Sequence, residues 1–327
     1  MEFRTISEIK RADETIDYSS GVMMMGSCFA GEIGRQFRAG KMNVLINPFG
    51  VLYNPLSTAR SLEMIMEGKT FRREDLHHYD NKYLSFYHDT GFSSRESSIS
   101  LDRINRSISC ANDFLSSATF LFITYGTAWV YRWKENKELV ANCHKIPAAQ
   151  FTRHLLTRED IVKTWQDVIV QVRNFNRDLK IVFTVSPVRH LKDGAHGNQV
   201  SKATLLMAIE DMIAADNDLS YFPSYEIMLD DLRDYRFYAK DMVHPSDAAI
   251  EYIWEKFREC YFTPGTNTIY ARVKKITDAR NHKITGDDVD SINEFSQSIL
   301  QKISNIKKDF PGVDMEEEEK YFSDLLT

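Results

Sequence analysis

Three residue types that together perform acyl transfer are present in this chain. Ser27 follows a short apolar run that ends at Gly26, and Asp241 lies three residues before His244, which Pro245 follows. A serine hydrolase needs a hydroxyl nucleophile, an imidazole base and a carboxylate that fixes the imidazole tautomer. Across one turn the Asp241 carboxylate can reach Nδ1 of His244 and leave Nε2 facing a serine. The residues indicate acyl-ester chemistry, although the order Ser, Asp, His also occurs in many proteins by chance.

Ser27 has a second role open to it, that of a helix cap. Residues 22–26 read as a buried strand, and Phe29, Ile33 and Phe37 follow at helical spacing. A serine at this junction can cap the helix. The same turn can also lift a nucleophile above the carboxyl edge of a sheet. The turn alone does not distinguish the two roles.

Short apolar runs alternate with amphipathic helical patterns from residue 22 to residue 261. Strands are expected at residues 22–26, 42–46, 119–126, 180–187 and 221–227. Helices are expected to begin near residues 28, 57, 101, 157 and 198, with a last one through residues 250–257. This alternation predicts an α/β fold, a three-layer α/β/α sandwich around a parallel sheet of about five strands. Ligands of such sheets bind beyond the carboxyl ends of the strands.

The alternation stops after residue 262. We expect one α/β domain over residues 1–262 and a helical C-terminal extension over residues 263–327. The extension ends in the acidic run 316–319, which we interpret as a solvated face. Its helices are the expected surface for any oligomer.

Histidines gather between residues 71 and 100, where His77, His78 and His88 lie among aromatic residues. Their spacings match no zinc motif, so pocket-lining or surface positions are favoured and no metal is expected. No cofactor is expected either.

Composition and charge restrict the kind of partner. The formal net charge of -6 gives no reason to expect a nucleic acid or an anionic membrane. The four cysteines form no metal-ligand pattern and are expected as free thiols of a reducing compartment. The N-terminal residues carry charges throughout, unlike a secretory signal, and no apolar run approaches the roughly 18 residues of a membrane span. We therefore expect a cytoplasmic protein.

The segment Gly26-Ser27-Cys28-Phe29-Ala30 resembles the signature of the GSCFA family, a branch of the SGNH (GDSL-like) hydrolases. The resemblance covers roughly residues 3–262. It includes the segments 47–50, 126–129, 186–190 and 241–245. It implies a flavodoxin-like fold and a Ser-Asp-His triad that acts on lipid, aryl or carbohydrate acyl esters.

The resemblance assigns roles to single residues. Ser27 matches the nucleophile, Asp241 the orienting acid and His244 the general base. The backbone N–H groups of Ser27 and Gly50 match two donors of the oxyanion hole.

The third donor departs from the family pattern. It would be an asparagine side chain, but this chain has Ala128 at that position. Thr127 or the side chain of Asn47 is the expected substitute. Losing one such donor costs about 10²–10³ in rate. A non-catalytic ligand-binding protein on a hydrolase scaffold is therefore a second hypothesis, and an O-acyltransferase with the same triad is a third.

Further polar residues are candidates for binding a small-molecule or carbohydrate acyl ester. Arg189 and His190 follow the fourth expected strand and could bind an anionic or sugar group, and His144 could reach the same pocket. Trp129 is a candidate pocket wall, with the core as its favoured place. Cys28 is expected to pack rather than to react.

Overall fold

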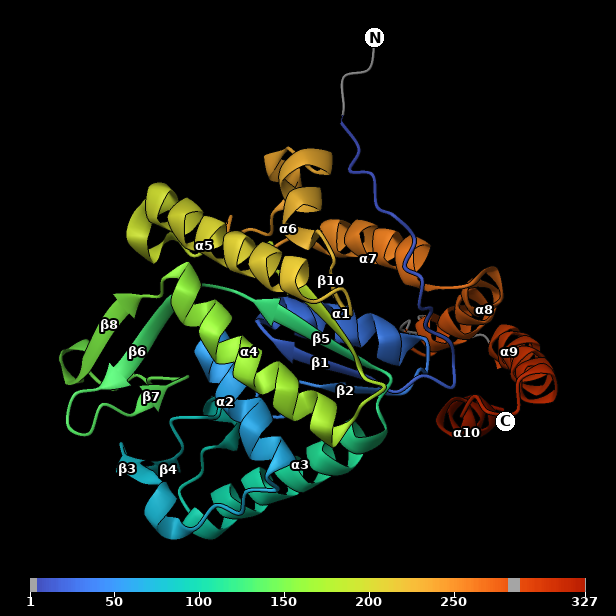
Figure 1. Ribbon diagram of the computed structural model, residues 1–327. Helices are drawn as coiled ribbons and strands as arrows, with labels where there is room; N and C mark the ends of the chain where they lie inside the picture. Colours follow the sequence, from blue (N-terminus) through green and yellow to red (C-terminus); the bar gives the residue numbers. More distant parts are fainter. Residues whose placement is uncertain (1–4, 282–288, 327) are drawn as a thin grey trace. The chain divides into compact units, whose positions relative to one another are not determined.

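The computed structural model describes residues 5–281 and 289–326, and Figure 1 labels its helices and strands along the chain. The chain divides into two units. The first consists mainly of residues 21–33 and 45–253, and the second of residues 9–20, 34–44 and those from 254 onward. All candidate site residues named above belong to the first unit. The domain boundary at residue 262, expected from the sequence, stays a prediction.

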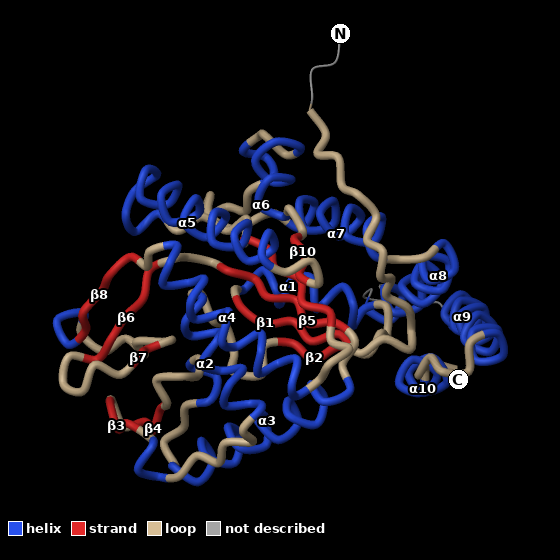
Figure 2. Tube along the Cα trace, viewed as in Figure 1, coloured by secondary structure: helices blue, strands red, loops and turns tan. Residues whose placement is uncertain are grey.

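A five-stranded parallel sheet forms the centre of the first unit (Figure 2). Its strands are β1 (Val22–Gly26), β2 (Val44–Ile46), β5 (Phe120–Tyr125), β9 (Lys180–Val185) and β10 (Leu219–Tyr221). Their order across the sheet is β10-β9-β5-β1-β2. Counted along the chain this is 2-1-3-4-5, the order of flavodoxin-like folds. The predicted α/β sandwich with about five parallel strands and C-terminal helices is confirmed.

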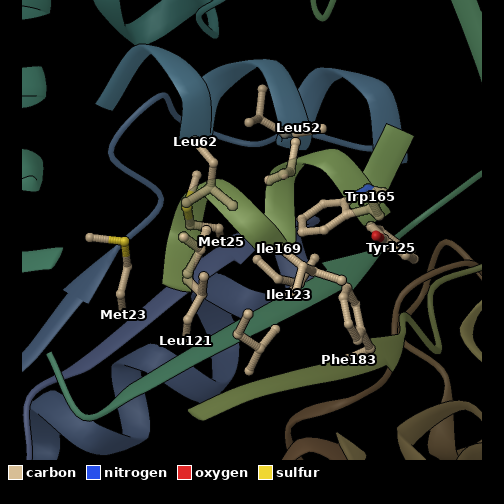
Figure 3. Close-up of a cluster of buried hydrophobic side chains, with 14 of the residues drawn as sticks. Met23, Met25, Leu52, Leu62, Leu121, Ile123, Tyr125, Trp165, Ile169 and Phe183 are labelled. Atoms are coloured by element: carbon tan, nitrogen blue, oxygen red, sulfur yellow. The ribbon is translucent and has the colours of Figure 1, made fainter. Parts of the chain in front are cut away.

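Both faces of the sheet are covered. On one face, side chains of β1 and β5 meet those of α2 and α4 (Figure 3). The labelled residues there include Met23, Met25, Leu62, Leu121, Ile123, Trp165 and Ile169. Because side chains alternate along a strand, Met24 and Phe122 point to the opposite face. That face is covered too, since neither side chain is more than 3% exposed.

The helices connect the strands in the expected places. They are α1 (Cys28–Ala39), α2 (Pro55–Met66), α3 (Ser97–Ser117), α4 (Arg158–Phe175), α5 (Gly194–Ala215), the short α6 (Ser224–Glu226) and α7 (Asp247–Tyr261). A π-helical segment, Ile227–Asp231, follows α6. In the described part of the chain, no helix has the length and apolarity that crossing a membrane requires.

Several predicted boundaries are wrong. Helices α3 and α5 each begin four residues earlier than expected, at Ser97 and Gly194. Two further differences have a clear local reason. Helix α2 begins at Pro55 rather than near residue 57, because the Asn54 side chain caps it and accepts the N–H of Ser57 at 2.9 Å. The last strand ends at Tyr221, and residues 224–226 are helical. Pro223 has no N–H with which to continue the ladder.

The first unit also contains two smaller antiparallel sheets. A hairpin of β3 (His77–Tyr79) and β4 (Lys82–Leu84) lies within the polar segment 71–100. A three-stranded antiparallel sheet joins β6 (Trp129–Trp133) to β7 (Leu139–Val140) and β8 (Phe151–Leu155). The sequence did not predict β8, because its alternating residues are only partly buried.

The second unit is helical at its C-terminal end, with α8 (Pro264–Asn281), α9 (Val289–Asp309) and α10 (Glu316–Asp324). Its core includes Ile276, Ile303 and Phe322. The acidic run is not wholly solvated, which corrects the prediction. Glu318 is only 2% exposed, because its carboxylate pairs with Lys41 at 2.8 Å and Arg280 at 2.9 Å.

Candidate active site

Ser27 occupies the sharp turn between β1 and α1. Gly26 precedes it with φ +125°, and a β-carbon at that position would lie 2.1 Å from the Thr124 carbonyl oxygen. Only glycine therefore permits this turn beside β5. The Ser27 N–H donates to the same Thr124 oxygen at 3.0 Å, and Oγ accepts the N–H of Phe29 at 3.3 Å. Ser27 thus caps α1, and it is fully buried.

Asp241 and His244 form a bonded pair in an exposed loop. Nδ1 of His244 lies 2.7 Å from Oδ2 of Asp241, as the spacing predicted. Oδ1 of Asp241 accepts the N–H groups of Val243 at 2.9 Å and His244 at 3.0 Å. The N–H of His244, that of Val243 and the imidazole lower the pKa of Asp241 to about 2. The ionised carboxylate keeps the proton on Nδ1, so Nε2 of His244 is left as the basic nitrogen.

We call residues 237–246 the histidine loop. It is closed at its base, where the N–H of Ser246 donates to the carbonyl of Phe237 at 2.8 Å. Arg189 tethers the loop to the end of β9. Its N–H donates to Val243 O at 3.1 Å and its guanidinium to Met242 O at 3.2 Å. Arg189, predicted to bind substrate, therefore also holds the loop that carries the candidate base.

The serine and the histidine loop are not joined directly. Both residues belong to the described part of the chain, and there no hydrogen bond links Ser27 to His244. The His244 side chain is 49% exposed, whereas Ser27 is buried. The candidate triad therefore has its acid and base paired and its nucleophile separate.

His190 lies beside Ser27. A β-carbon on Gly126 would be 3.2 Å from Nε2 of His190 and 3.5 Å from Cβ of Ser27. The imidazole ring and the serine side chain therefore both lie close to Gly126. Nε2 of His190 is buried and has no hydrogen-bond partner among the described residues. Burial, and then the charges of Lys202 and His244, lower the pKa of His190 to about 4.

Lys202, on α5, is the residue that sequence reasoning missed. Its ammonium donates to the carbonyl oxygens of Gly126 at 2.8 Å and Ser186 at 2.6 Å, and so joins the ends of β5 and β9. Burial lowers its pKa to about 7, while the two carbonyl bonds favour the charged form. The available signal was its helical phase. Lys202 lies on the same apolar stripe as Leu205 and Ile209.

The N–H groups expected in the oxyanion hole have acceptors within the protein. That of Ser27 donates to Thr124, that of Gly50 to Asn47 O at 2.7 Å, and that of Thr127 to Tyr53 O at 2.8 Å. The Thr127 hydroxyl is 3.0 Å from that of Ser201.

The side chain of Asn47 is the remaining predicted donor. Its Oδ1 accepts the N–H of Gly26 at 2.9 Å. No acceptor for its amide Nδ2 is found in the described part of the chain. Among the predicted groups, this amide is therefore a donor still free to meet a ligand.

Two other predicted binding residues make contacts of their own. The Arg153 guanidinium lies 3.8 Å from the centre of the Trp129 ring. His144 bonds through Nε2 to Ser85 O at 2.8 Å, and it is buried. Neither is shown in contact with Ser27, so their roles in binding stay predictions.

The histidines of segment 71–100 are not arranged as a metal site. His88 is buried and stacks on Phe49 with ring centres 4.2 Å apart, and His77 lies 3.5 Å from a Glu138 oxygen. Within residues 5–281 and 289–326, no group of three or more His, Cys, Asp or Glu side chains could hold a metal ion.

A cavity of about 300 Å³ opens beside the histidine loop. Arg189 and three tyrosines, Tyr225, Tyr235 and Tyr238, line it, together with residues of α5 and apolar side chains of the π-helical segment. Neither Ser27 nor His244 is among the lining residues. The cavity meets the histidine loop through Tyr238 and the tether of that loop through Arg189.

Comparison with known proteins identifies the family of the chain. Residues 21–257 match the family model described as the GSCFA family, and the chain belongs to that family. No curated protein matches the chain. Among solved structures, it is similar to an acetyl xylan esterase (Est2A) from the rumen bacterium Butyrivibrio proteoclasticus. That similarity has 12% identity and a TM-score of 0.38, and it covers 74% of this chain and 63% of that chain.

Proposed function

We propose that this protein is a serine hydrolase of acyl esters, of the SGNH (GDSL-like) type, with Ser27 as nucleophile, His244 as base and Asp241 as orienting acid. The observation that carries the proposal is the 2.7 Å bond between Asp241 and Nδ1 of His244. An ionised carboxylate on Nδ1 fixes the tautomer that a general base needs. Membership of the GSCFA family supports the same assignment.

The reaction proceeds through an acyl-enzyme. Nε2 of His244 takes the hydroxyl proton while Oγ of Ser27 bonds to the acyl carbon, and the carbonyl π pair moves to oxygen. Collapse restores the C=O bond and breaks the ester C–O bond, and His244 gives its proton to the departing alkoxide. Water, deprotonated by His244, then attacks the acyl carbon. The Ser27 oxygen leaves and regains its proton.

This sequence requires Nε2 of His244 to reach Oγ of Ser27. Catalytic hydrogen bonds often tighten only in the substrate complex. The histidine loop is the part that must adjust, because its side chains are exposed and Ser27 is fixed by the sheet. A shift of the loop about its base at Phe237 and Ser246 would bring the imidazole inward.

The cavity beside the loop is the proposed site for the alcohol part of the substrate. Its tyrosine hydroxyls and the Arg189 guanidinium suit the hydroxyl and carbonyl oxygens of a small molecule or a carbohydrate. Tyr235 is 67% exposed and offers a ring face on which a sugar can stack. A cytoplasmic location and an oligomer through the C-terminal helices stay predictions.

The test is hydrolysis of p-nitrophenyl acetate by the wild type, Ser27→Ala and His244→Ala. We expect kcat to fall by at least about 10⁴ in Ser27→Ala and in His244→Ala alike, because the two residues act as a unit. Lys240→Ala is the matched control for the loop, since Lys240 is an exposed loop residue with no assigned step. Equal rates in the wild type and Ser27→Ala would exclude this function.

A ligand-binding protein on the same scaffold is the second candidate. The internal bonds of the Ser27 and Gly50 N–H groups favour it, because they leave fewer donors for a reacting oxyanion. A binding protein would bind acetylated sugars saturably in the wild type and in Ser27→Ala alike, without turnover. An O-acyltransferase is separated from a hydrolase by adding a sugar acceptor, since transfer then yields the acylated sugar in place of free acid.

A further inference from the structure

A buried imidazole nitrogen without a partner lies next to the candidate nucleophile. Nε2 of His190 is shielded from solvent, and no described residue accepts from it or donates to it. A buried polar atom left unpaired costs free energy, so each such atom calls for an explanation, and a catalytic role is one of them. The position of this one, across Gly126 from Ser27, suggests where its partner belongs.

The proposed oxyanion hole lacks a donor after β5. Residue 128 is an alanine where the SGNH pattern has an asparagine, and the Thr127 hydroxyl faces Ser201. The N–H groups of Gly126 and Thr127 both donate to Tyr53 O at 2.8 Å. The end of β5 therefore offers no obvious donor of its own, whereas the end of β9 brings His190 to that point.

We propose that the His190 imidazole, in its neutral form with the proton on Nε2, donates to the acyl oxygen when Ser27 attacks, and that Lys202 positions it. The inference rests on the proposed function, because it assigns a group to the same reaction. No proton is transferred in this step. The Nε2–H bond stays intact while the carbonyl oxygen gains negative charge and accepts the hydrogen bond.

Four groups hold the ring and set its charge. The N–H of His190 donates to Oδ1 of Asn198 at 2.8 Å, and the Tyr53 ring meets the imidazole edge-on at 5.6 Å between centres. The groups whose charges lower its pKa are Lys202 on α5 and His244 in the histidine loop. A buried cation close by disfavours a second positive charge, so the imidazole stays neutral through the ordinary histidine range.

Neutrality selects the role of donor over that of base. A general base works best with a pKa near the operating pH. His190, with a pKa of about 4, binds a proton poorly, whereas a neutral imidazole polarises a carbonyl without first losing a proton. His244, bonded to an ionised carboxylate, is the better base of the two.

Lys202 acts through the backbone. Its ammonium bonds Gly126 O and Ser186 O, and so joins the backbone beside Ser27 to the segment that leads to His190. It touches neither reacting atom and is therefore a positioning residue. Its second effect is electrostatic, since its charge adds to burial in lowering the pKa of His190.

The first test measures the wild type itself. ¹⁵N NMR of the histidine side chains, titrated from pH 7 to pH 3.5, reports the tautomer and pKa of each ring. We expect the His190 ring to be the Nε2–H tautomer with a pKa near 4. The exposed ring of His196 serves as the reference signal in the same spectra. A proton on Nδ1, or titration of His190 near pH 6.5, would overturn the inference whatever the enzyme does.

The second test compares His190→Leu with His190→Gln on p-nitrophenyl acetate, with His196→Leu as matched control. We expect kcat of His190→Leu to fall by about 10²–10³ while KM changes little. His190→Gln supplies an N–H and should recover at least tenfold over the leucine variant. The contrary result is a wild-type activity that depends on Ser27 and that stays within about threefold in His190→Leu. That result would exclude His190 from the reaction and leave the proposed function intact.

A third comparison separates charge from packing at Lys202. In Lys202→Met the pKa of His190 should rise by about one, and in Lys202→Arg it should stay low, because arginine keeps the charge. An unchanged His190 pKa in Lys202→Met would contradict the electrostatic effect assigned to Lys202. If His190 were the base, His190→Gln would be as inactive as His190→Leu and His244→Ala would retain activity, which also contradicts the proposal.

Discussion

The surroundings of Ser27 and the loop that carries His244 are built in opposite ways. Ser27 is buried, follows a glycine that no other residue can replace without strain, and shares its backbone bonds with β5. The histidine loop is exposed and is held by bonds to itself and by the side chain of Arg189. The nucleophile is thus positioned by the sheet, whereas the base is positioned by a few exposed contacts.

This difference predicts that substitutions in the two regions act in different ways. Substitutions near Ser27 should act through folding as well as through chemistry, because the sheet core depends on that turn. Substitutions in the histidine loop should change catalysis and leave the stability of the fold almost untouched. Each of the following experiments measures activity and stability together, so that the contrast itself is tested.

The largest effect is expected from Asp241→Asn. An amide cannot hold the imidazole tautomer as the carboxylate does, so kcat should fall by about 10⁴. Melting temperature should change little, because the pair is half-exposed. The control is Asp102→Asn on α3, an aspartate of the same exposure that pairs with Arg106. Full activity of Asp241→Asn would remove Asp241 from the site.

The next largest effect is expected at the turn that carries Ser27. Gly26→Ala places a β-carbon 2.1 Å from the Thr124 carbonyl oxygen at a φ of +125°, so backbone must shift. We expect the free energy of unfolding to fall by roughly 3 kcal/mol or more, measured by urea denaturation. Gly68→Ala is the matched control. It also has a positive φ (+59°), but the nearest atom to an added β-carbon is 4.0 Å away, so it should cost about 1–2 kcal/mol.

Arg189→Met should have a moderate effect that is confined to activity. The variant loses the guanidinium bond to Met242 O and keeps the backbone bond to Val243 O. One lost charge-assisted bond corresponds to about a tenfold fall in kcat/KM. The comparison is Arg106→Met, since that arginine is exposed and pairs with Asp102 on its own helix α3. A tenfold loss in both variants would mean that the tether is not specific.

The smallest effect is a pH dependence of stability. The pKa of Asp241 is lowered from 3.8 to about 2, so the folded state holds the ionised form more strongly than the unfolded chain does. The resulting stability is fully present above about pH 4 and is lost as the pH falls toward 2. Asp241→Asn should lose less stability than the wild type between these values, as measured by urea denaturation at pH 4.5, 3.5 and 2.5. Parallel curves would contradict the lowered pKa.

Much of the fold could be predicted from the sequence because its signals are local. The strand–helix alternation, the turn at Gly26 and the reach of Asp241 to His244 each depend on residues close together in the chain. Strand β8 was missed because its side chains alternate between partly buried and exposed places. The start of α2 depended on Asn54, whose capping role is clear only once the turn is known.

The missed part of the site depends on contacts between distant segments. Lys202 bonds carbonyl groups 76 and 16 residues away, which no local pattern encodes. His190 was named as a substrate-binding residue, but its place beside Ser27 follows from the register of β5 and β9. The internal acceptors of the Ser27 and Gly50 N–H groups are equally a matter of tertiary structure.

The central claim is that Ser27 is a nucleophile activated by His244. The most direct measurement is covalent labelling by a fluorophosphonate, followed by intact mass and peptide mapping in the wild type, Ser27→Ala and His244→Ala. The account predicts one label per chain on the peptide containing Ser27, no label in Ser27→Ala, and labelling slower by about 10² or more in His244→Ala. An unlabelled wild type, or equal labelling of Ser27→Ala, would contradict it.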